Sequence, residues 1–419
     1  LVLGPRRKPP VDLMESAYTI YILVLGGMIV LVLLLRPALE HIGVPPLVGY
    51  FVLGFALRLA DAQWSLLDAT GHEIFAFLGS VGIVVLLFRV GLESDLPGLV
   101  ERLPPASLVW GSNVAVSGGA GYGAAAYGLG WPLVPSLFVG VALTATSVGV
   151  AVALWDEADL LKTDDGELML DVAELDDVSG VVLMGVLFTL APVFHANPAA
   201  SLIPLAAQTL GGFALKFAAF TAGCIAVSLY VEEPLTAFFE QIQRWPGTIM
   251  VVLGIGMVVA AIASLLGFSL AIGAFFAGLI FSRDPKAVKM ETSFNAFYPL
   301  FAAFFFIDIG LRIDPTALGG ALGPALVLLA AAVIGKGLGV LLPALALTSS
   351  SGALLLSLSL VPRAEIMLII MQRGLDLGPW AVPPELFAQM VLVSAATTLL
   401  VPPLVRPLFS HLPSSPNSL

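Results

Sequence analysis

The chain has 419 residues, of which 58% are hydrophobic and only 11% are charged. So few polar groups cannot cover a soluble globule of this length, so the composition excludes a soluble protein and predicts a polytopic membrane protein. The formal net charge is -11, but much of the acid lies in short loops and within apolar stretches. We therefore expect no nucleic-acid partner.

Cysteine and histidine usage argues against metal and redox chemistry. The single cysteine, Cys224, lies in an apolar stretch, and the four histidines show no ligand spacing. A disulfide and a structural metal site are therefore not expected. We predict no cofactor and no enzymatic activity.

The apolar runs predict an all-α protein with about thirteen transmembrane helices, since each can cross much of a hydrocarbon layer of about 30 Å. The predicted spans cover residues 17–36, 46–60, 74–92, 105–128, 134–155, 166–195, 201–231, 247–265, 268–282, 296–311, 318–346, 351–372 and 386–408. Residues 1–16 are predicted to form an N-terminal tail and residues 409–419 a short cytoplasmic tail. The first run is longer than a signal-peptide core of about 7–15 residues, so we expect a retained first span.

The basic residues predict the orientation of these spans. One side of the membrane receives Arg36, Arg89, Arg102, Lys162, Arg244, Arg283, Lys286, Lys289 and Arg406. By the positive-inside rule this side is cytoplasmic, which places the amino terminus outside and the carboxyl terminus inside.

The two halves of the chain resemble each other at an offset of 219 positions. The matches are residues 91–95 (GLESD) with 310–314 (GLRID), Arg89 with Asp308, Thr146 with Glu365, Asp177 near Thr397 and Thr398 and, more loosely, residues 48–54 with 272–278. An odd number of predicted helices lies between equivalent spans, so the two copies enter the membrane from opposite sides. This is the inverted-repeat plan of secondary transporters. Chance similarity among glycine-rich apolar helices is the alternative.

Acids recur along the span 166–195 at spacings of four, three and three, namely Glu167, Asp171, Glu174 and Asp177. This spacing places them on one helical face. Charges at membrane depth are costly and mark ion or proton paths, so we predict ion or proton binding at Asp177 and its neighbour Asp176. Glu167, Asp171 and Glu174 then form a cytoplasmic cation funnel. The alternative is a loop over residues 174–180.

Two other spans carry signals of helix breaks. Residues 144–149 (TATSVG) place hydroxyls inside an apolar run, and Thr146 and Ser147 are candidate oxygen ligands for a hard cation. Residues 361–365 (VPRAE) place a proline and two opposite charges inside a span, and proline opens a helix by removing a backbone donor. We expect Arg363 and Glu365 to support the broken helix more than to bind the ion.

Lys336 lies among apolar residues near the middle of the span 318–346. A buried lysine needs an acidic neighbour to remain charged, and we predict that Asp176 is this neighbour, which leaves Asp177 free to exchange a proton for a cation. Snorkelling of Lys336 to the membrane interface is the alternative.

Together these segments resemble the bacterial cation:proton antiporters of the NapA and Kef type, within the wider sodium/proton antiporter superfamily. The resemblance covers nearly the whole chain, and its landmarks are residues 44–50 (VPPLVGY), 87–93 (LFRVGLE), 144–149 (TATSVG), 175–178 (LDDV) and 361–365 (VPRAE). The chain departs from the family pattern at Arg89, Glu174, Asp308 and Ala364.

The resemblance implies an NhaA/NapA-like fold with two broken crossing helices and a homodimer. It places a core domain at about residues 74–195 and 296–408 and a dimerisation domain at about residues 17–60 and 201–282. In that family the second aspartate of the pair binds the cation or proton, which corresponds to Asp177. The first pairs with a lysine, which corresponds to Asp176 with Lys336 and implies electrogenic exchange.

We therefore expect an antiporter of a bacterial inner membrane that exchanges sodium, or lithium or potassium, for protons by alternating access at one shared site. Potassium exchange of Kef type is one alternative. We expect no regulatory domain in that case, because only a short tail follows Arg406. A cation-coupled symporter of an organic solute and a channel-like or sensory subunit are alternatives of other classes.

Overall fold

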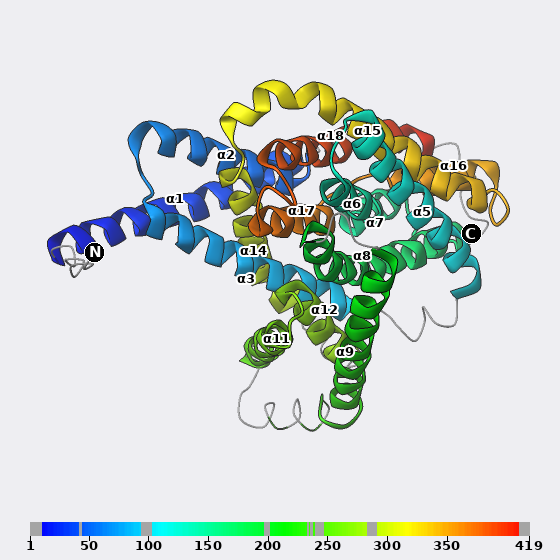
Figure 1. Ribbon diagram of the computed structural model, residues 1–419, viewed down its shortest axis with the longest axis horizontal. Coiled ribbons are helices and arrows are strands. Elements are labelled where there is room, and N and C mark those ends of the chain that lie inside the picture. Colours follow the sequence, from blue (N-terminus) through cyan, green and yellow to red (C-terminus); the bar gives the residue numbers. More distant parts are fainter. Residues whose placement is uncertain are drawn as a thin grey trace. The chain divides into compact units, whose positions relative to one another are not determined.

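The computed structural model describes residues 11–409 except 42–43, 94–102, 197–201, 233, 235–237, 239–246 and 283–290. All regular secondary structure in these residues is helical (Figure 1). In chain order the helices are α1 (Val11–His41), α2 (Pro46–Trp64), α3 (Ala69–Glu93), α5 (Leu103–Gly123), η1 (Ala124–Gly128), α6 (Leu133–Ala142), α7 (Val148–Glu157), α8 (Asp164–Ala196), α9 (Leu202–Tyr230), α11 (Gly247–Leu265), α12 (Leu270–Phe281), α14 (Glu291–Leu311), α15 (Pro315–Ala344), α16 (Ser350–Ser359), α17 (Glu365–Leu377) and α18 (Pro384–Phe409).

The predicted spans agree with these helices. Every predicted span overlaps one helix or two consecutive ones. Span 105–128 covers α5 and η1, and the spans 134–155 and 351–372 are interrupted by non-helical residues, the first between α6 and α7 and the second between α16 and α17. Six described helices are long and apolar enough to cross a membrane, and shorter apolar helices accompany them. The alternative of a loop over residues 174–180 does not apply, because α8 is continuous there.

Helix α1 begins at Val11, inside the range 1–16 that was predicted as an N-terminal tail. Residues 1–10 and 410–419 lie outside the described part of the chain, as do the basic residues Arg102, Arg244, Arg283, Lys286 and Lys289.

The chain divides into two compact units. The first contains the described residues of Leu1–Gly82 and Pro299–Arg312, and the second those of Ile83–Tyr298 and Ile313–Leu419. Within the first unit α2 and α14 cross backbone to backbone, because a Cβ on Gly54 would overlap the carbonyl oxygen of Ile307 and one on Gly310 would overlap that of Phe51.

A second crossing of the same kind joins α3 and α12 in the second unit. A Cβ on Gly91 would overlap the carbonyl oxygen of Phe275, and one on Gly278 would overlap that of Phe88. Small residues allow such close helix contacts in membranes, where lipid offers no hydrophobic driving force between helices.

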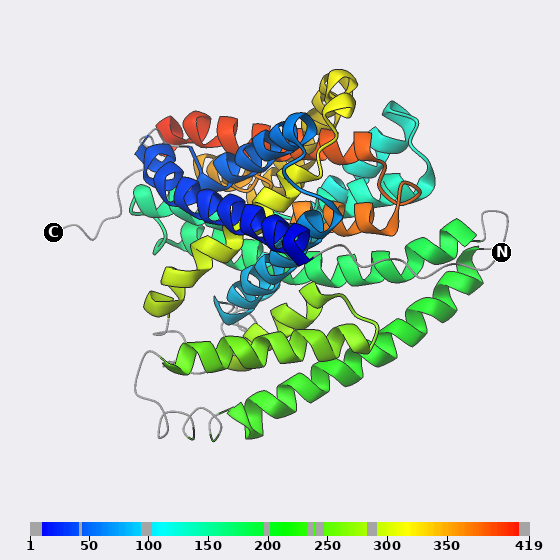
Figure 2. The same cartoon turned by 90° about the vertical axis from the view of Figure 1, so that its left-hand side faces the viewer.

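The rest of the second unit is a bundle built on α5, α8, α15 and α18, with α6, α7, α16 and α17 packed among them (Figure 1). An apolar cluster that includes Trp155, Met169 and Leu356 fills its interior, and the Trp155 ring nitrogen donates to Ser359 Oγ at 2.9 Å. Helices α9 and α12 contact α8, and Figure 2 shows α8 and α9 as the two long green helices.

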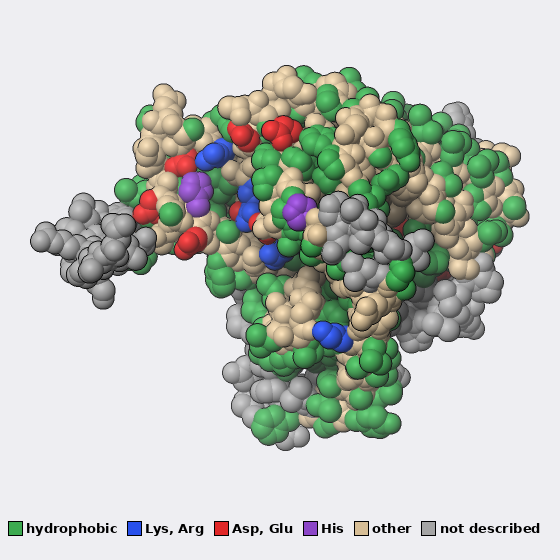
Figure 3. All heavy atoms as spheres, in the orientation of Figure 1, with side chains coloured by type: hydrophobic (Ala, Val, Ile, Leu, Met, Phe, Trp, Pro, Cys, Tyr) green, Lys and Arg blue, Asp and Glu red, His purple; other side chains and the backbone are tan. Residues whose placement is uncertain are grey.

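The outer surface is suited to lipid. Large apolar side chains such as Leu23, Leu215 and Leu265 are at least 73% exposed. On the face drawn in Figure 3, hydrophobic side chains are many and charged ones are few. Since exposed apolar surface of this extent is not tolerated in water, the helices present it to the hydrocarbon of a bilayer.

Candidate functional site

Two broken helices cross in the second unit. Residues 143–147 between α6 and α7 and residues 360–364 between α16 and α17 are not helical. The segments touch where the Ser147 amide donates to the Pro362 carbonyl at 2.9 Å. The local sequence explains both breaks, because the Thr144 hydroxyl bonds back to the Val141 carbonyl and Pro362 has no amide to continue a helix.

Asp176 is held by donors from three other elements. Lys336 Nζ of α15 lies 2.5 Å from Asp176 Oδ2, Thr146 Oγ1 of the first break lies 2.6 Å from the same oxygen, and Asn113 Nδ2 of α5 lies 2.7 Å from Oδ1. Lys336 also donates to the Thr144 carbonyl at 3.1 Å. These are the partners that a buried carboxylate needs in order to keep its charge.

Lys336 does not snorkel, because its side chain is fully buried and paired with Asp176. Asn113, which lies inside the predicted span 105–128, was not among the predicted site residues. The available signal was an amide inside an apolar helix, followed four residues later by Ser117, whose hydroxyl donates to Asn113 Oδ1 at 2.8 Å. The Ser117 bond fixes the amide so that its nitrogen faces Asp176.

Asp177 faces a different environment from its neighbour. Successive residues of a helix point about 100° apart, so the helix that aims Asp176 at Lys336 aims Asp177 elsewhere. Asp177 lines a cavity of about 470 Å³. No described residue forms a hydrogen bond or ion pair with its carboxylate in this structure.

The cavity carries a concentration of acids. Its lining residues are Leu86, Arg89, Val90, Thr146, Val148, Gly149, Val152, Ala153, Asp156, Leu170, Glu174, Asp177, Tyr298, Glu365 and Ile366. Of the predicted acidic funnel, Glu174 joins Asp177 in this lining, whereas the exposed Glu167 and the buried Asp171 are not part of it. Helical spacing therefore predicts which face of α8 carries the acids, and packing against neighbouring helices determines which of these acids line the cavity.

Arg363 and Glu365 each bind the first broken helix, and the described structure contains no ion pair between them. An Arg363 guanidinium nitrogen donates to the Ala145 carbonyl, and Ser147 Oγ lies 3.3 Å from Glu365 Oε2. The Arg363 carbonyl accepts from Ser394 at 2.8 Å and from Thr398 at 3.1 Å, both on α18. The two side chains thus tie the second break to the first break, and the Arg363 backbone carbonyl ties it to α18.

Arg89 is the one basic side chain among the described residues that line the cavity. Its guanidinium carbon lies 4.2 Å from the centre of the Tyr298 ring, at a distance typical of a cation–π contact. A positive charge therefore stands in the same cavity as Asp177, Glu174 and Glu365.

The comparisons with known proteins place this chain in one class, the membrane exchangers of cations and protons. The family model described as "Sodium/hydrogen exchanger, transmembrane" matches residues 27–411. The chain belongs to the sodium/hydrogen exchanger family and is a multi-pass membrane protein.

Individual relatives agree with this assignment. The chain is 26% identical to the high-affinity Na+/H+ antiporter NhaS3 of Synechocystis, over 92% of this chain and 82% of that protein. It is 25% identical to a Na+/H+ antiporter of Enterococcus hirae, over 91% and 97% of the two chains. The structure of the sodium proton antiporter MjNhaP1 from Methanocaldococcus jannaschii at pH 8 matches 94% of this chain and 99% of its own with a TM-score of 0.70 and 16% identity, so it shares the fold.

Proposed function

We propose that the protein is a secondary active antiporter of a bacterial inner membrane that exchanges sodium for protons at Asp177. The contrast between the two adjacent aspartates carries this proposal. Asp176 is held by Lys336, Thr146 and Asn113, whereas no described residue holds Asp177 in this way, and Asp177 lines an acid-rich cavity. A carboxylate at membrane depth that lines a cavity is the kind of group that binds a proton and a hard monovalent cation in turn.

Competition for one carboxylate explains why exchange is obligatory. A bare negative charge is costly to move through the low-dielectric barrier. The transporter therefore changes between its inward-facing and outward-facing conformations only when Asp177 holds a proton or a cation. Thr146, Ser147 and backbone oxygens freed at the breaks are the neighbouring oxygen donors for the cation. Asp176 with Lys336 keeps a fixed pair of charges beside the site, which supports the electrogenic exchange that the family resemblance implies.

The glycine crossings support the inverted repeat. The repeat alignment relates Gly54 to Gly278 and Gly91 to Gly310, and these are the glycines at which α2 crosses α14 and α3 crosses α12. Each half of the chain thus contributes one helix to each crossing. We infer that the halves are inverted copies, and the homodimer and the division into core and dimerisation domains remain part of the same proposal.

Proteoliposomes test the exchange directly. With an imposed proton gradient, addition of sodium is expected to dissipate the gradient, and parallel additions of lithium, potassium and choline name the preferred cation. Acceleration by valinomycin with potassium on both sides would indicate electrogenic exchange. Dissipation by potassium but not by sodium would show that potassium is the transported cation. The absence of any cation response from folded protein would overturn antiport in favour of a cation-coupled symporter.

Arg89→Gln is expected to lower the KM for the transported cation by roughly twofold to tenfold with little change in maximal rate. Removal of the positive charge from an acid-lined cavity raises the local cation concentration, and two charges in such a partly hydrated space interact by roughly 1 kcal/mol. KM is measured from the cation dependence of gradient dissipation. Lys162→Gln is the matched control, since it removes one positive charge at an exposed site between α7 and α8. An unchanged or higher KM in Arg89→Gln would contradict this role.

A further inference from the structure

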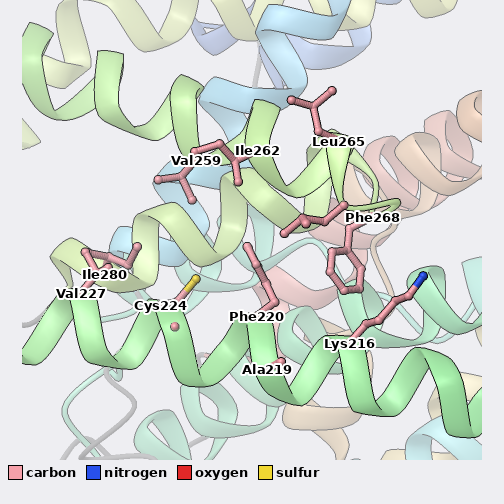
Figure 4. A pocket seen from close by; sticks show the side chains of 12 residues that line it. Lys216, Ala219, Phe220, Cys224, Val227, Val259, Ile262, Leu265, Phe268 and Ile280 are labelled. Atoms are coloured by element: carbon pink, nitrogen blue, oxygen red, sulfur yellow. The ribbon is translucent and has the colours of Figure 1, made fainter.

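A second cavity, of about 720 Å³, lies between α9 and the hairpin of α11 and α12 (Figure 4). Phe220 and Cys224 reach into it from α9, and Val259 and Ile262 from α11. Apart from one lysine, the side chains that line this groove are apolar or, at Cys224, weakly polar. Its volume falls within the range of about 300–1,000 Å³ that is usual for ligand pockets.

That lysine, Lys216, stands at one end of the groove near Phe268, and Val227 and Ile280 mark the other end (Figure 4). Ser228 Oγ donates to the Ile280 carbonyl at 2.8 Å, so the later part of α9 lies beside the end of α12. Lys216 precedes Ser228 by about three turns, or about 18 Å, which brings it level with the α11–α12 turn. Residues 264–267 at the α11–α12 turn are exposed, so protein does not enclose their free backbone groups. Exposed backbone of this kind must reach water, so this end of the groove lies toward the membrane interface.

Lys216 is exposed, and no described residue forms a hydrogen bond or ion pair with it. A charge in a membrane-spanning helix is stabilised by an opposite charge or by reaching the interface. Among the described residues, the groove therefore combines a long apolar trough with one lysine that no carboxylate pairs with, at its interfacial end. This is the charge pattern that complements an anionic phospholipid, whose phosphate is the negative group and whose acyl chain is the apolar one.

We propose that this groove binds an anionic phospholipid, with an acyl chain along α9 between Phe220 and Ile280 and the headgroup phosphate on Lys216. A second copy of the chain is the other conceivable occupant. The lipid fits better because the described lining residues offer one positive charge and an apolar trough, and none of them has a side-chain carboxylate or amide that would pair with polar groups of a protein surface.

The test uses Cys224, the only cysteine of the chain, as a reporter inside the groove. Delipidated protein in detergent is titrated with phosphatidylglycerol or phosphatidylcholine, and both the Tm and the rate of Cys224 alkylation by N-ethylmaleimide are followed. Phosphatidylglycerol is expected to raise the Tm and slow alkylation at lower concentration than phosphatidylcholine does. Lys216→Gln is expected to weaken the apparent affinity for phosphatidylglycerol by about fivefold, the effect of one lysine beside anionic lipid.

Lys162→Gln, which removes an exposed lysine far along the chain from the groove, is expected to keep the wild-type preference. Equal effects of the two lipids on the wild type would overturn the proposal, as would a full preference retained by Lys216→Gln. Alkylation that slows with protein concentration in the absence of lipid would also overturn it, since a second copy would then cover the groove. None of these readouts depends on exchange activity.

Discussion

Asp177→Asn is expected to abolish cation-dependent dissipation of a proton gradient while leaving expression and Tm close to those of the wild type. Asparagine has nearly the same shape as aspartate, but it carries no charge and has no carboxylate that could take up and release a proton. No described residue forms a hydrogen bond to the Asp177 carboxylate, so the substitution removes no internal bond and relieves a buried charge. The measurement is gradient dissipation in proteoliposomes, with the Tm of the same preparations.

Glu174→Gln is the matched control for this variant. It removes one negative charge from the same cavity, one helical turn before Asp177, without touching the proposed binding carboxylate. We expect it to retain exchange with a higher KM for the cation. Exchange at wild-type rates in Asp177→Asn would move the binding site to another acid of the cavity, and equal loss in both variants would show that the cavity charge as a whole, not Asp177, carries transport.

The charged part of the site could be predicted from the sequence because apolar surroundings make each charge stand out. Asp176 and Lys336 are separated by 160 positions, yet each is a charge in the middle of an apolar run and each needs the other for the same electrostatic reason. The breaks in the two crossing helices were visible for a local reason, since Pro362 and the hydroxyls of residues 144–147 weaken helical hydrogen bonding where they occur.

Other parts of the site depend on three-dimensional neighbours, and their signals in the sequence are weaker. Arg363 is followed two residues later by an opposite charge, Glu365, but its guanidinium turns to the Ala145 carbonyl of another helix. Asn113 was missed because an amide in a membrane helix is as compatible with ordinary helix contacts as with a functional site. The division of the acidic stripe is likewise set by packing, since one helical face holds all four acids and only Glu174 and Asp177 meet the cavity.

The second large effect concerns the buried ion pair. Lys336→Ala is expected to lower the free energy of unfolding by roughly 3–5 kcal/mol, because it leaves the Asp176 carboxylate buried without its counter-charge. Lys336 is fully buried and Asp176 is only 1% exposed, so water cannot replace the lost ammonium without rearrangement. The expected readout is a large drop in Tm of the detergent-solubilised protein, accompanied by loss of exchange.

The charge-swapped variant, Asp176→Lys with Lys336→Asp, separates this pairing from a general intolerance of change at either position. It is expected to recover part of the stability lost in Asp176→Lys and in Lys336→Asp alone. Recovery should be incomplete, because Asn113 Nδ2 and Thr146 Oγ1 now donate to Asp176 and would have to turn to present oxygen to the new ammonium. If the effects of the two single changes simply add in the double variant, Asp176 and Lys336 contribute independently. Their 2.5 Å contact would then not be the source of stability.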